Sequence, residues 1–323
     1  MVESYATAHK SELHFGAVLG LGVEETAAEA RWLEELGYEY VGSGEHFMRG
    51  NPPGPSSAVL PVLAVAAGAT IRIRLLSSVV LIPFYHPTIL AKLTSTLDIA
   101  SGGRLMLGIG VGGEYPVEFQ AAGISVRQRG GRADECLEAL KRLWTQEHVD
   151  YQGRYYKLDD VTIVPPPAQQ PHPPIWVAGR RDAAMRRAVR YGDSWFPYLY
   201  SPERYRDSVD KINAFAAEEG RDLSGFQWAN FQFMSIYDTR EEAARVAAHS
   251  LGIQYQYSGD FMDIVGRYCV LGPVEECVRR LEEYVEAGAR HFLFSWACPP
   301  EDRARHIETV ANEIIPRLRS LSH

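Results

Sequence analysis

The sequence predicts an α/β fold of the (β/α)8 TIM-barrel type, with insertions after the fourth and the seventh strand. Strand-like and helix-like segments alternate about eight times along the 323 residues. Most of the strand-like segments are short, apolar and rich in β-branched residues, which is typical of parallel strands covered on both faces. Because parallel strands need helical crossovers, eight such units favour a closed barrel over an open sheet.

Four strand–helix units are expected in the first half of the chain. The helix at 87–99 begins with Pro87, whose missing N–H is not needed in a first turn. The helix at 133–144 carries a single apolar stripe, as a helix on the outside of a barrel requires. The expected strands are 14–19, 40–43, 73–82 and 105–109. The expected helices are 23–36, 57–68, 87–99 and 133–144.

The alternation pauses in the middle of the chain and then resumes. Residues 149–164 predict a hairpin, and six prolines follow between Pro165 and Pro174, a composition that often marks a domain boundary. Because strands and helices alternate again afterwards, we expect one barrel domain over residues 1–323. It contains an excursion at about 148–174 and an insertion at about 252–272. The later strands are expected at 175–178, 194–196, 226–237 and 290–296, and the later helices at 183–191, 202–219, 240–251, 274–287 and 303–318.

Composition excludes several classes of protein. A net charge of −8 without a basic run argues against binding to nucleic acid or to an anionic membrane. No segment approaches the roughly 18 apolar residues of a membrane helix, and the N-terminal stretch lacks the apolar core of a signal peptide. The ten histidines include no pair with a helical spacing suited to a metal, so no metal is expected. Four cysteines, Cys136, Cys269, Cys277 and Cys298, lie far apart and are expected to be reduced in a cytoplasmic protein.

The residues that follow each strand matter most for function, because a TIM barrel carries its active site at the C-terminal ends of its strands. His46 follows the second expected strand, directly after Glu45. A histidine ring exchanges protons near neutral pH, so His46 is the first candidate for an acid or a base. The alternative is a histidine that only binds backbone. Glu114, after the fourth strand, either supplies a proton or caps the next short helix.

Glycines gather after the fourth strand, where the absence of side chains lets the backbone approach a flat or phosphorylated ligand. Gly110, Gly112 and Gly113 are therefore expected to contact a cofactor. Together with Gly108 they match GxGxxG, but that fingerprint belongs after the first strand of its unit and needs an acid at the next strand. Here the nearest acids at that distance lie inside a helix, so the sequence does not indicate a dinucleotide site.

The fifth strand is followed by the candidate phosphate site. Ala178, Gly179 and Arg180 precede a helix, and backbone N–H groups in that position bind anions. Arg180 can add a charged fork to such a site. The alternative is that Arg180 and Arg181 are solvated residues of the first helical turn.

Two further groups of residues lie near the expected strand ends. Arg129 and Arg132 precede the clearest helix, and we expect them to form surface ion pairs with Asp134 or Glu135. Aromatic side chains are expected to line an apolar substrate pocket. The candidates for this pocket are Phe47, Tyr115, Trp195, Phe196, Tyr198 and Trp296.

Four segments between about residues 13 and 298 resemble the luciferase-like monooxygenase superfamily. They are HPTILAKLTSTLDIASGGRLMLGIGVG (86–112), RGGRADECLEALKRLW (129–144), PHPPIWVAG (171–179) and RAVRYGDSWFP (187–197). The resemblance implies a TIM-type barrel that binds reduced FMN or the deazaflavin F420. It also implies that the Glu45–His46 pair faces the ring of the cofactor.

The resemblance carries two more structural expectations. A non-proline cis peptide is expected at Ser77-Ser78 or Ser78-Val79, where the third strand meets the cofactor, so Ser78 and Val79 are expected to contact it. Members of the superfamily usually have a Gly-Gly-Ser-like turn at the phosphate, and this chain instead has Ala178-Gly179-Arg180. The small residues are partly kept, and the arginine is a departure.

The expected function is a reduced-FMN-dependent monooxygenase of a small organic substrate. The alternatives are an F420-dependent oxidoreductase that transfers a hydride, and a flavin-binding protein without catalysis. Glu45-His46 resembles the luciferase-type sequence more than the Asp-His of typical F420 enzymes, and the acidic chain shows no basic channel for the glutamyl tail of F420. The resemblance also suggests a homodimer and a separate flavin reductase as partners. The loops expected to select the substrate, 49–55 and 254–267, have no diagnostic pattern.

Overall fold

The computed structural model describes residues 12–20, 22–50, 52–255 and 261–320, and these form a closed parallel barrel. Each of its eight strands pairs in parallel with the next, and the last strand pairs with the first. The predicted fold class is therefore confirmed. The barrel strands are β1 (His14–Val18), β2 (Tyr40–Ser43), β3 (Arg74–Ser77), β5 (Leu105–Gly110), β8 (Ile175–Ala178), β9 (Ser194–Phe196), β10 (Gln227–Ile236) and β12 (His291–Trp296).

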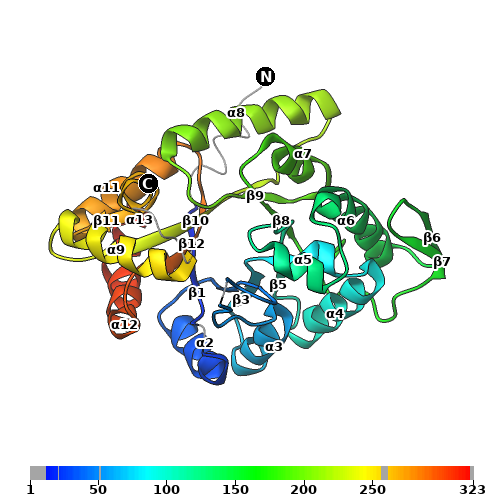
Figure 1. Cartoon of the computed structure of the whole chain (residues 1–323), viewed down its shortest axis with the longest axis horizontal. Coiled ribbons are helices and arrows are strands. Elements are labelled where there is room, and N and C mark those ends of the chain that lie inside the picture. Colours follow the sequence, from blue (N-terminus) through cyan, green and yellow to red (C-terminus); the bar gives the residue numbers. More distant parts are fainter. Residues whose placement is uncertain (1–11, 21, 51, 256–260, 321–323) are drawn as a thin grey trace.

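Helices surround the strands (Figure 1). The main hydrophobic core lies between the strands and these helices and contains, for example, Phe15, Leu75 and Leu140. The helix expected at 133–144 begins earlier, at Arg129, and a 3-10 turn at Val23–Glu25 replaces the start of the first expected helix. The helices are α2 (Thr26–Glu35), α3 (Val59–Ala69), α4 (Pro87–Ala100), α6 (Arg129–Thr145), α7 (Asp182–Tyr191), α8 (Pro202–Glu219), α9 (Arg240–Tyr255), α11 (Val274–Glu286), α12 (Pro300–Thr309) and α13 (Ile315–Ser320).

The barrel interior is filled with side chains below the ends of the strands. Its buried residues form a separate cluster, and four partly buried residues, Val18, Val79, Ala178 and Phe231, pack against that cluster. Any ligand site at this barrel therefore lies above the cluster, at the mouth, as in other TIM barrels. The buried residues of the interior are Tyr40, Leu76, Met106, Trp176, Phe196, Ala229 and Leu293.

The third strand differs from the continuous strand expected at 73–82. β3 ends at Ser77, the Ser78–Val79 peptide is cis, and a short strand β4 (Val80–Leu81) follows before a 3-10 turn at Ile82–Phe84. The expected cis peptide is thus confirmed at the second of its two candidate positions. The sequence pattern does not reveal this break, because apolar residues lie on both sides of Ser77-Ser78, in β3 and in β4.

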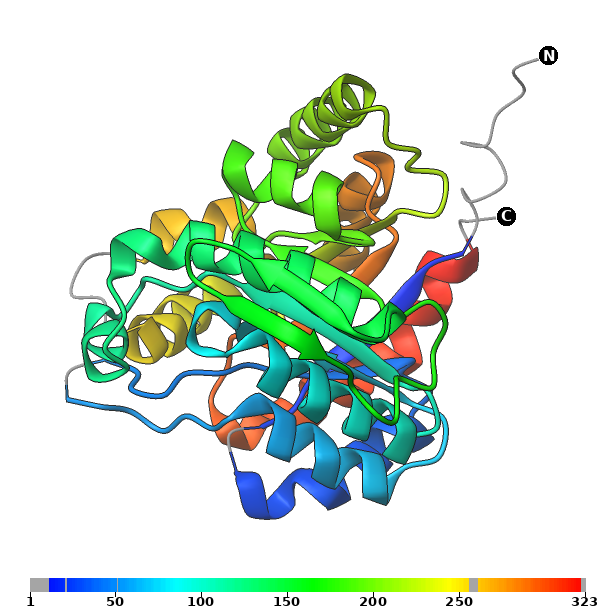
Figure 2. The same cartoon turned by 90° about the vertical axis from the view of Figure 1, so that its right-hand side faces the viewer.

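The two expected insertions are present. The first follows α6 and contains an antiparallel hairpin, β6 (Val149–Gln152) with β7 (Lys157–Val161); a short helix, α5 (Pro116–Ala121), lies between β5 and α6. The hairpin lies beside α6 at the periphery (Figures 1 and 2). The second insertion contains α10 (Met262–Tyr268) and β11 (Val270–Gly272), which pairs with β10. Residues 256–260 of this insertion lie outside the described residues.

Arg104 joins the ends of two helices in the turn after α4. Its guanidinium donates hydrogen bonds to the carbonyl oxygens of Ala67, Ser101 and Ile73 at 2.9, 2.6 and 2.9 Å. It also donates to the Thr70 hydroxyl at 2.8 Å. The Arg104 guanidinium thus binds carbonyl groups that have no partner inside the helix, at the C-terminal ends of both α3 and α4.

Two expectations from composition concern the whole fold. All four cysteine thiols are free, and three of them are buried. Within the described ranges, no helix combines the length and the apolar character that crossing a bilayer would need.

Candidate active site

The loops that carry the candidate residues meet along one edge of the barrel mouth. β2, β3, β5 and β8 are consecutive neighbours in the barrel, so their C-terminal ends are adjacent. A Cβ added to Gly110 would lie 2.6 Å from Cγ2 of Val79, and one added to Gly44 would lie 3.3 Å from the carbonyl oxygen of Ser78. The residues before His46, the Ser78–Val79 peptide and the glycine cluster therefore form a continuous surface.

Gly108 does not belong to this surface. A Cβ at this position would lie 1.9 Å from the carbonyl oxygen of Ser77, inside the β3–β5 pair. Gly108 is needed for close packing of two strands, so the match to GxGxxG is a coincidence of spacing. Gly110 is the last residue of β5, and Gly112 and Gly113 follow the strand.

His46 is held by a carboxylate that the sequence analysis did not identify. Its Nδ1 lies 3.2 Å from both carboxylate oxygens of Glu118, a buried residue of α5. The edge of the Tyr115 ring packs at 5.0 Å between ring centroids. In the described part of the chain, Nε2 of His46 has no hydrogen-bond partner. The ring is thus fixed at one nitrogen and available at the other.

Glu118 also anchors the loop that carries His46. One of its oxygens, Oε1, accepts hydrogen bonds from the backbone N–H groups of Phe47 at 2.7 Å and Met48 at 3.0 Å. Burial raises the pKa of Glu118, but the hydrogen bonds from His46 and from these two amides hold that pKa below its ordinary value. The sequence signal was weak, because Glu118 and His46 are 72 residues apart.

Glu45 points away from His46 and into the scaffold. Its buried carboxylate accepts hydrogen bonds from the Tyr85 hydroxyl at 2.7 Å and from the backbone N–H groups of Leu81 at 3.0 Å and Val59 at 3.2 Å. Burial raises the pKa of Glu45 despite these donors. The side chain expected to face the cofactor instead ties the β2 loop to α3 and β4, so its contacts are those of a structural residue.

Glu114 contacts the loop after β9. Its carboxylate accepts a hydrogen bond from the Tyr198 hydroxyl, and the Arg180 guanidinium lies 4.7 Å from the centre of the Tyr198 ring. Burial and, next, the Glu114 charge raise the pKa of Tyr198. The alternative role for Glu114 fails, since Tyr115 is the N-cap of α5 and no side chain caps that helix.

The turn at Gly179 to Arg181 is shaped to expose backbone N–H groups. The Gly179 carbonyl oxygen accepts a hydrogen bond from Nε1 of Trp195 at 2.9 Å, and that of Arg180 accepts from the Tyr200 hydroxyl at 3.3 Å and from Arg204 at 3.2 Å. In a trans peptide the C=O and the next N–H point in opposite directions. The N–H groups of Arg180 and Arg181 therefore point away from β9 and α8.

The N–H groups of Arg180 and Arg181 are followed directly by the unpaired N–H groups at the N-terminus of α7. The first N–H groups of a helix have no partner inside the helix, and no side chain caps the N-terminus of α7. Gly179 has a φ of +140°, and a Cβ there would lie 2.5 Å from Cβ of Ala184, so only glycine fits. The turn offers the donors of an anion site.

Two of the expected pocket residues face away from the barrel interior. Trp195 and Trp296 are buried in the main core between the strands and the helices. Successive side chains of a strand point to opposite faces, and the interior is occupied by Phe196 on β9 and by Leu293 on β12. Trp195 is next to Phe196, and Trp296 is three residues after Leu293, so both tryptophans point outward. They are no longer candidates for the pocket.

The other aromatic candidates remain near the mouth. Phe47 is 48% exposed, and its ring meets the Phe84 ring edge-on at 5.3 Å. Phe84 in turn packs against Phe119 of α5 at 4.6 Å. Tyr115 lies on His46, and Tyr198 lies under Arg180. These rings give the mouth an apolar rim.

The ion pairs expected for Arg129 and Arg132 are not formed. Arg129 donates to the carbonyl oxygen of Val126 at 2.8 Å, and Arg132 lies 5.2 Å from the centre of the Tyr156 ring. The acids have other partners: Asp134 pairs with Arg187, and Glu135 binds backbone N–H groups of the hairpin. The prediction was wrong because a helix places these acids against elements that follow later in the chain.

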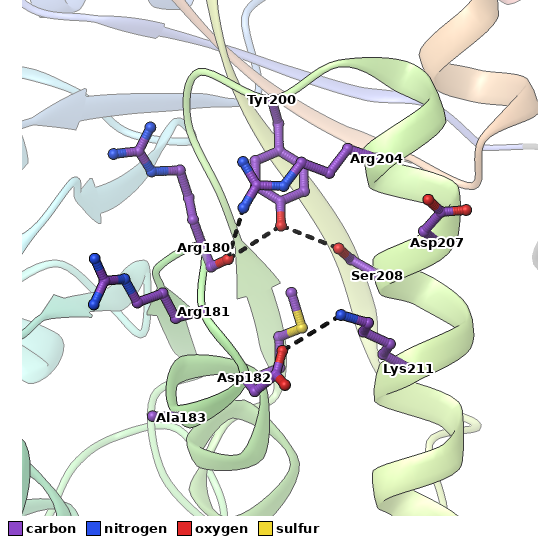
Figure 3. Close-up of a pocket in the computed structure, with 10 residues that line it drawn as sticks. Arg180, Arg181, Asp182, Ala183, Tyr200, Arg204, Asp207, Ser208 and Lys211 are labelled. Carbon is purple, nitrogen blue, oxygen red and sulfur yellow. Dashed lines mark hydrogen bonds and ion pairs between the residues drawn. The ribbon is translucent and has the colours of Figure 1, made fainter.

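A pocket of about 530 Å³ lies behind the Gly179–Arg181 turn, between the N-terminal ends of α7 and α8 (Figure 3). Arg204 donates to the Arg180 carbonyl across it, and Lys211 lies 3.6 Å from Asp182. Cations outnumber carboxylates in its wall. The charged lining residues are Arg180, Arg181, Arg204, Lys211, Asp182 and Asp207.

The residues at the mouth fit a flat ring with a phosphate. Gly110 lets the backbone at the end of β5 pack directly against the Val79 side chain, and the Gly179–Arg181 turn offers unpaired donors at the end of the neighbouring strand β8. Among the residues that the structure describes, no group of His, Cys, Asp and Glu is arranged to hold a metal ion. The donor set therefore suits an organic anion.

Comparison with known proteins identifies the family. The model of the luciferase-like monooxygenase family matches residues 6–291. The chain is 32% identical over 222 residues to the FMNH2-dependent dimethylsulfone monooxygenase of Pseudomonas putida, a match that covers 68% of this chain and 60% of that relative. It is 28% identical over 315 residues to the F420-dependent glucose-6-phosphate dehydrogenase of Intrasporangium calvum, covering 89% of this chain and 92% of that relative.

A solved structure agrees with these relatives. The crystal structure of a monooxygenase from Streptomyces bottropensis superposes with a TM-score of 0.82 and 27% sequence identity, covering 94% of this chain and 99% of that one. Both cofactor classes expected from the sequence thus occur among the relatives. The chain belongs to the luciferase-like monooxygenase family.

Proposed function

We propose that this enzyme uses reduced FMN to oxidise a small organic substrate at the barrel mouth. The observation that carries the proposal is the position of His46 at the mouth, after a strand that neighbours β3 and β5, with no hydrogen-bond partner for Nε2 among the described residues. The relative that acts on dimethylsulfone with FMNH2 supports the choice of cofactor.

The cofactor would be held by two sets of residues. Ser78, Val79, Gly110, Gly112 and Gly113 form the surface for the ring. The turn of Ala178, Gly179 and Arg180 takes the phosphate through its N–H groups and the arginine fork. Reduced FMN, when bound, supplies the electrons that let oxygen react with a substrate.

The side chains around this surface supply the rest of the chemistry. His46 accepts or donates a proton at Nε2. Glu114 and Tyr198 share a hydrogen bond at the same mouth and provide a second proton site. Phe47 and Tyr115 exclude water from the reacting atoms, which protects a water-sensitive reaction.

One observation favours F420 as the second candidate. FMN ends at its phosphate, whereas F420 continues into a glutamyl tail that carries carboxylates. The sequence shows no basic run for such a tail, but the wall of the pocket behind the phosphate turn contains four cations, Arg180 and Arg181 from the turn and Arg204 and Lys211 from α8. The relative that oxidises glucose 6-phosphate with F420 supports this alternative.

Cofactor binding and turnover separate the candidates. Purified protein is mixed with FMN and with F420, uptake is followed by absorbance, and turnover is tested with reduced FMN plus dimethyl sulfone and with F420 plus glucose 6-phosphate. Uptake of FMN with oxygen-dependent turnover supports the monooxygenase. Uptake of F420 but not FMN reverses the choice. Uptake without any turnover in a wider substrate panel favours the third alternative, flavin binding without catalysis.

We also propose a homodimer that forms through α3 and α4. Every residue of α3 is apolar, yet Val65 on its outer face is 44% exposed. On the adjacent α4, Ile89 and Leu93 are 57% and 44% exposed. A helix that is apolar all round is normally covered. Sedimentation equilibrium checks the proposal, since V65E combined with L93E should give a monomer if this face is the interface.

Two further proposals concern the surroundings of the enzyme. Because FMN must arrive reduced, we propose a separate flavin reductase as its supplier. Because all four thiols are free, we propose that the enzyme works in the cytoplasm, where thiols stay reduced. Reconstitution with a flavin reductase and NADH tests the first, and localisation of the tagged chain tests the second.

A further inference from the structure

The contacts of Glu118 assign it a function that its sequence position does not indicate. We propose that Glu118 is a positioning residue that holds His46 with its proton on Nδ1, so that Nε2 is free to act as the base. This inference rests on the proposed role of His46. Nδ1 lies 3.2 Å from both Glu118 oxygens. An ionised carboxylate only accepts hydrogen bonds, so the ring must present its N–H to it.

Glu118 is ionised when the enzyme works near neutral pH. Burial opposes ionisation, but three donors, His46 Nδ1 and the backbone N–H groups of Phe47 and Met48, hold the pKa of Glu118 below its ordinary value. A carboxylate that accepts several hydrogen bonds is favoured in its charged form. The partner of Nδ1 is therefore an anion throughout the pH range in which histidine titrates.

The consequence is a defined proton path at Nε2. With the proton on Nδ1, Nε2 carries the lone pair, and no other described residue hydrogen-bonds to it. When a substrate group gives up a proton, the N–H bond forms at Nε2 and the ring gains one positive charge. Glu118 then pairs with that charge, as the aspartate of a Ser-His-Asp triad does.

An isosteric substitution separates this role from the anchoring role. Oε1 of Glu118 is fixed by the N–H groups of Phe47 and Met48, at 2.7 and 3.0 Å. In Glu118→Gln the amide oxygen takes that position, because only oxygen can accept those bonds. The amide nitrogen then faces Nδ1 as a donor. The ring must respond by moving its proton to Nε2, although the loop stays anchored.

The experiment reads the protonated nitrogen directly. Protein labelled with ¹⁵N-histidine is studied by NMR without cofactor, and the signals of His46 are assigned by their loss in His46→Gln. The wild type is expected to show a protonated Nδ1 and an unprotonated Nε2, and Glu118→Gln the reverse. Turnover of Glu118→Gln, in whichever assay described above is active, should fall roughly 10²-fold or more.

Glu135→Gln is the matched control. Glu135 also accepts backbone N–H groups, from Arg154, Tyr155 and Tyr156 at 2.9, 2.8 and 3.3 Å, but it contacts no histidine. This variant should leave the His46 signals and the turnover unchanged.

The outcomes are distinct. A reversed tautomer with lost turnover supports the proposal. A His46 ring that keeps its proton on Nδ1 in Glu118→Gln overturns it, and Glu118 is then only a loop anchor. A third outcome is a reversed tautomer in Glu118→Gln together with full turnover of both Glu118→Gln and His46→Gln. It would show that the proposed function of His46 is wrong, and Glu118 would then have no catalytic role either.

Discussion

Nε1 of Trp195 donates a 2.9 Å hydrogen bond to the carbonyl oxygen of Gly179. Trp195 is fully buried in the main core, so this bond connects the core to the turn that we propose for the phosphate. The carbonyl is drawn towards β9, and the N–H of Arg180 in the same peptide plane is turned the opposite way. The core thus determines the direction of the donors that an anion would meet.

Trp195→Phe is expected to weaken FMN binding without affecting riboflavin, which has no phosphate. Losing one hydrogen bond of about 1 kcal/mol corresponds to roughly a 5-fold weaker affinity. Fluorescence titration of both ligands measures the effect. Trp144→Phe is the matched control, because the Trp144 indole is also buried but its Nε1 has no hydrogen-bond partner among the described residues. Equal losses for the two ligands would contradict the phosphate site.

His46→Ala is expected to lower turnover by roughly 10²–10⁴-fold, because the alanine can no longer accept or donate the proton. Cofactor affinity should change little, since the proposed ring and phosphate contacts come from other loops. Stopped-flow turnover and an FMN titration on the same preparation measure both quantities. Unaltered turnover would mean that His46 only ties α5 to the β2 loop.

The fold could be predicted from sequence because its pattern is repeated. Most strands are short apolar runs followed by a helix, so errors at single boundaries, such as the late start expected for α6, do not change the topology. The location of the site followed from the same topology, since the ends of neighbouring strands meet. Predictions that depended on chain order therefore held.

The direction of side chains could not be predicted in the same way. In a strand covered on both faces, both alternating sets are apolar, so the sequence Ser194-Trp195-Phe196 does not reveal which ring enters the barrel. The partner of His46 was missed for a related reason. Glu45 is next to His46 in the sequence, but Glu118 contacts His46 only because α5 packs against the loop after β2. A local sequence pattern cannot predict such a contact.

Charge reversal in the pocket behind the phosphate turn tests the F420 alternative. Lys211→Glu is expected to weaken F420 with a multi-glutamate tail by roughly 3–10-fold at low salt, with less effect on shorter tails, because a like charge then faces the carboxylates. FMN binding should not change. Arg206→Glu, an exposed arginine of α8 outside the pocket wall, is the control with the same net charge. Equal losses for both variants would indicate only long-range charge.

Arg104→Lys is expected to lower the free energy of unfolding by about 2–3 kcal/mol, because a lysine cannot reproduce a fork that donates to several carbonyl groups. The bonds at risk join the ends of α3 and α4. Urea denaturation measures the change, and Arg72→Lys, an exposed arginine nearby, should stay within about 0.5 kcal/mol of wild type. A stable Arg104→Lys protein would show that water replaces these bonds.

The histidine at the bottom of the barrel makes stability depend on pH. Burial, and then the charges of His14 and Arg74, lower the pKa of His291 to about 3, and its Nδ1 has no partner in the described structure. In the unfolded chain a histidine pKa is about 6.5, so the unfolded state binds more protons below that pH. The contribution of His291 is complete above about pH 6.5 and is lost progressively as the pH falls towards 3.

Between pH 6.5 and 5, this histidine should therefore remove about 1.6 kcal/mol from the free energy of unfolding, with a slope that approaches about 1.4 kcal/mol per pH unit near pH 5. Urea titrations at several pH values measure the slope. His291→Gln should flatten it by that amount, because glutamine does not titrate, whereas His249→Gln, on the exposed face of α9, should leave it unchanged. If His291→Gln keeps the wild-type slope, the ring already binds its proton in the folded barrel, and the acid sensitivity must come from other groups.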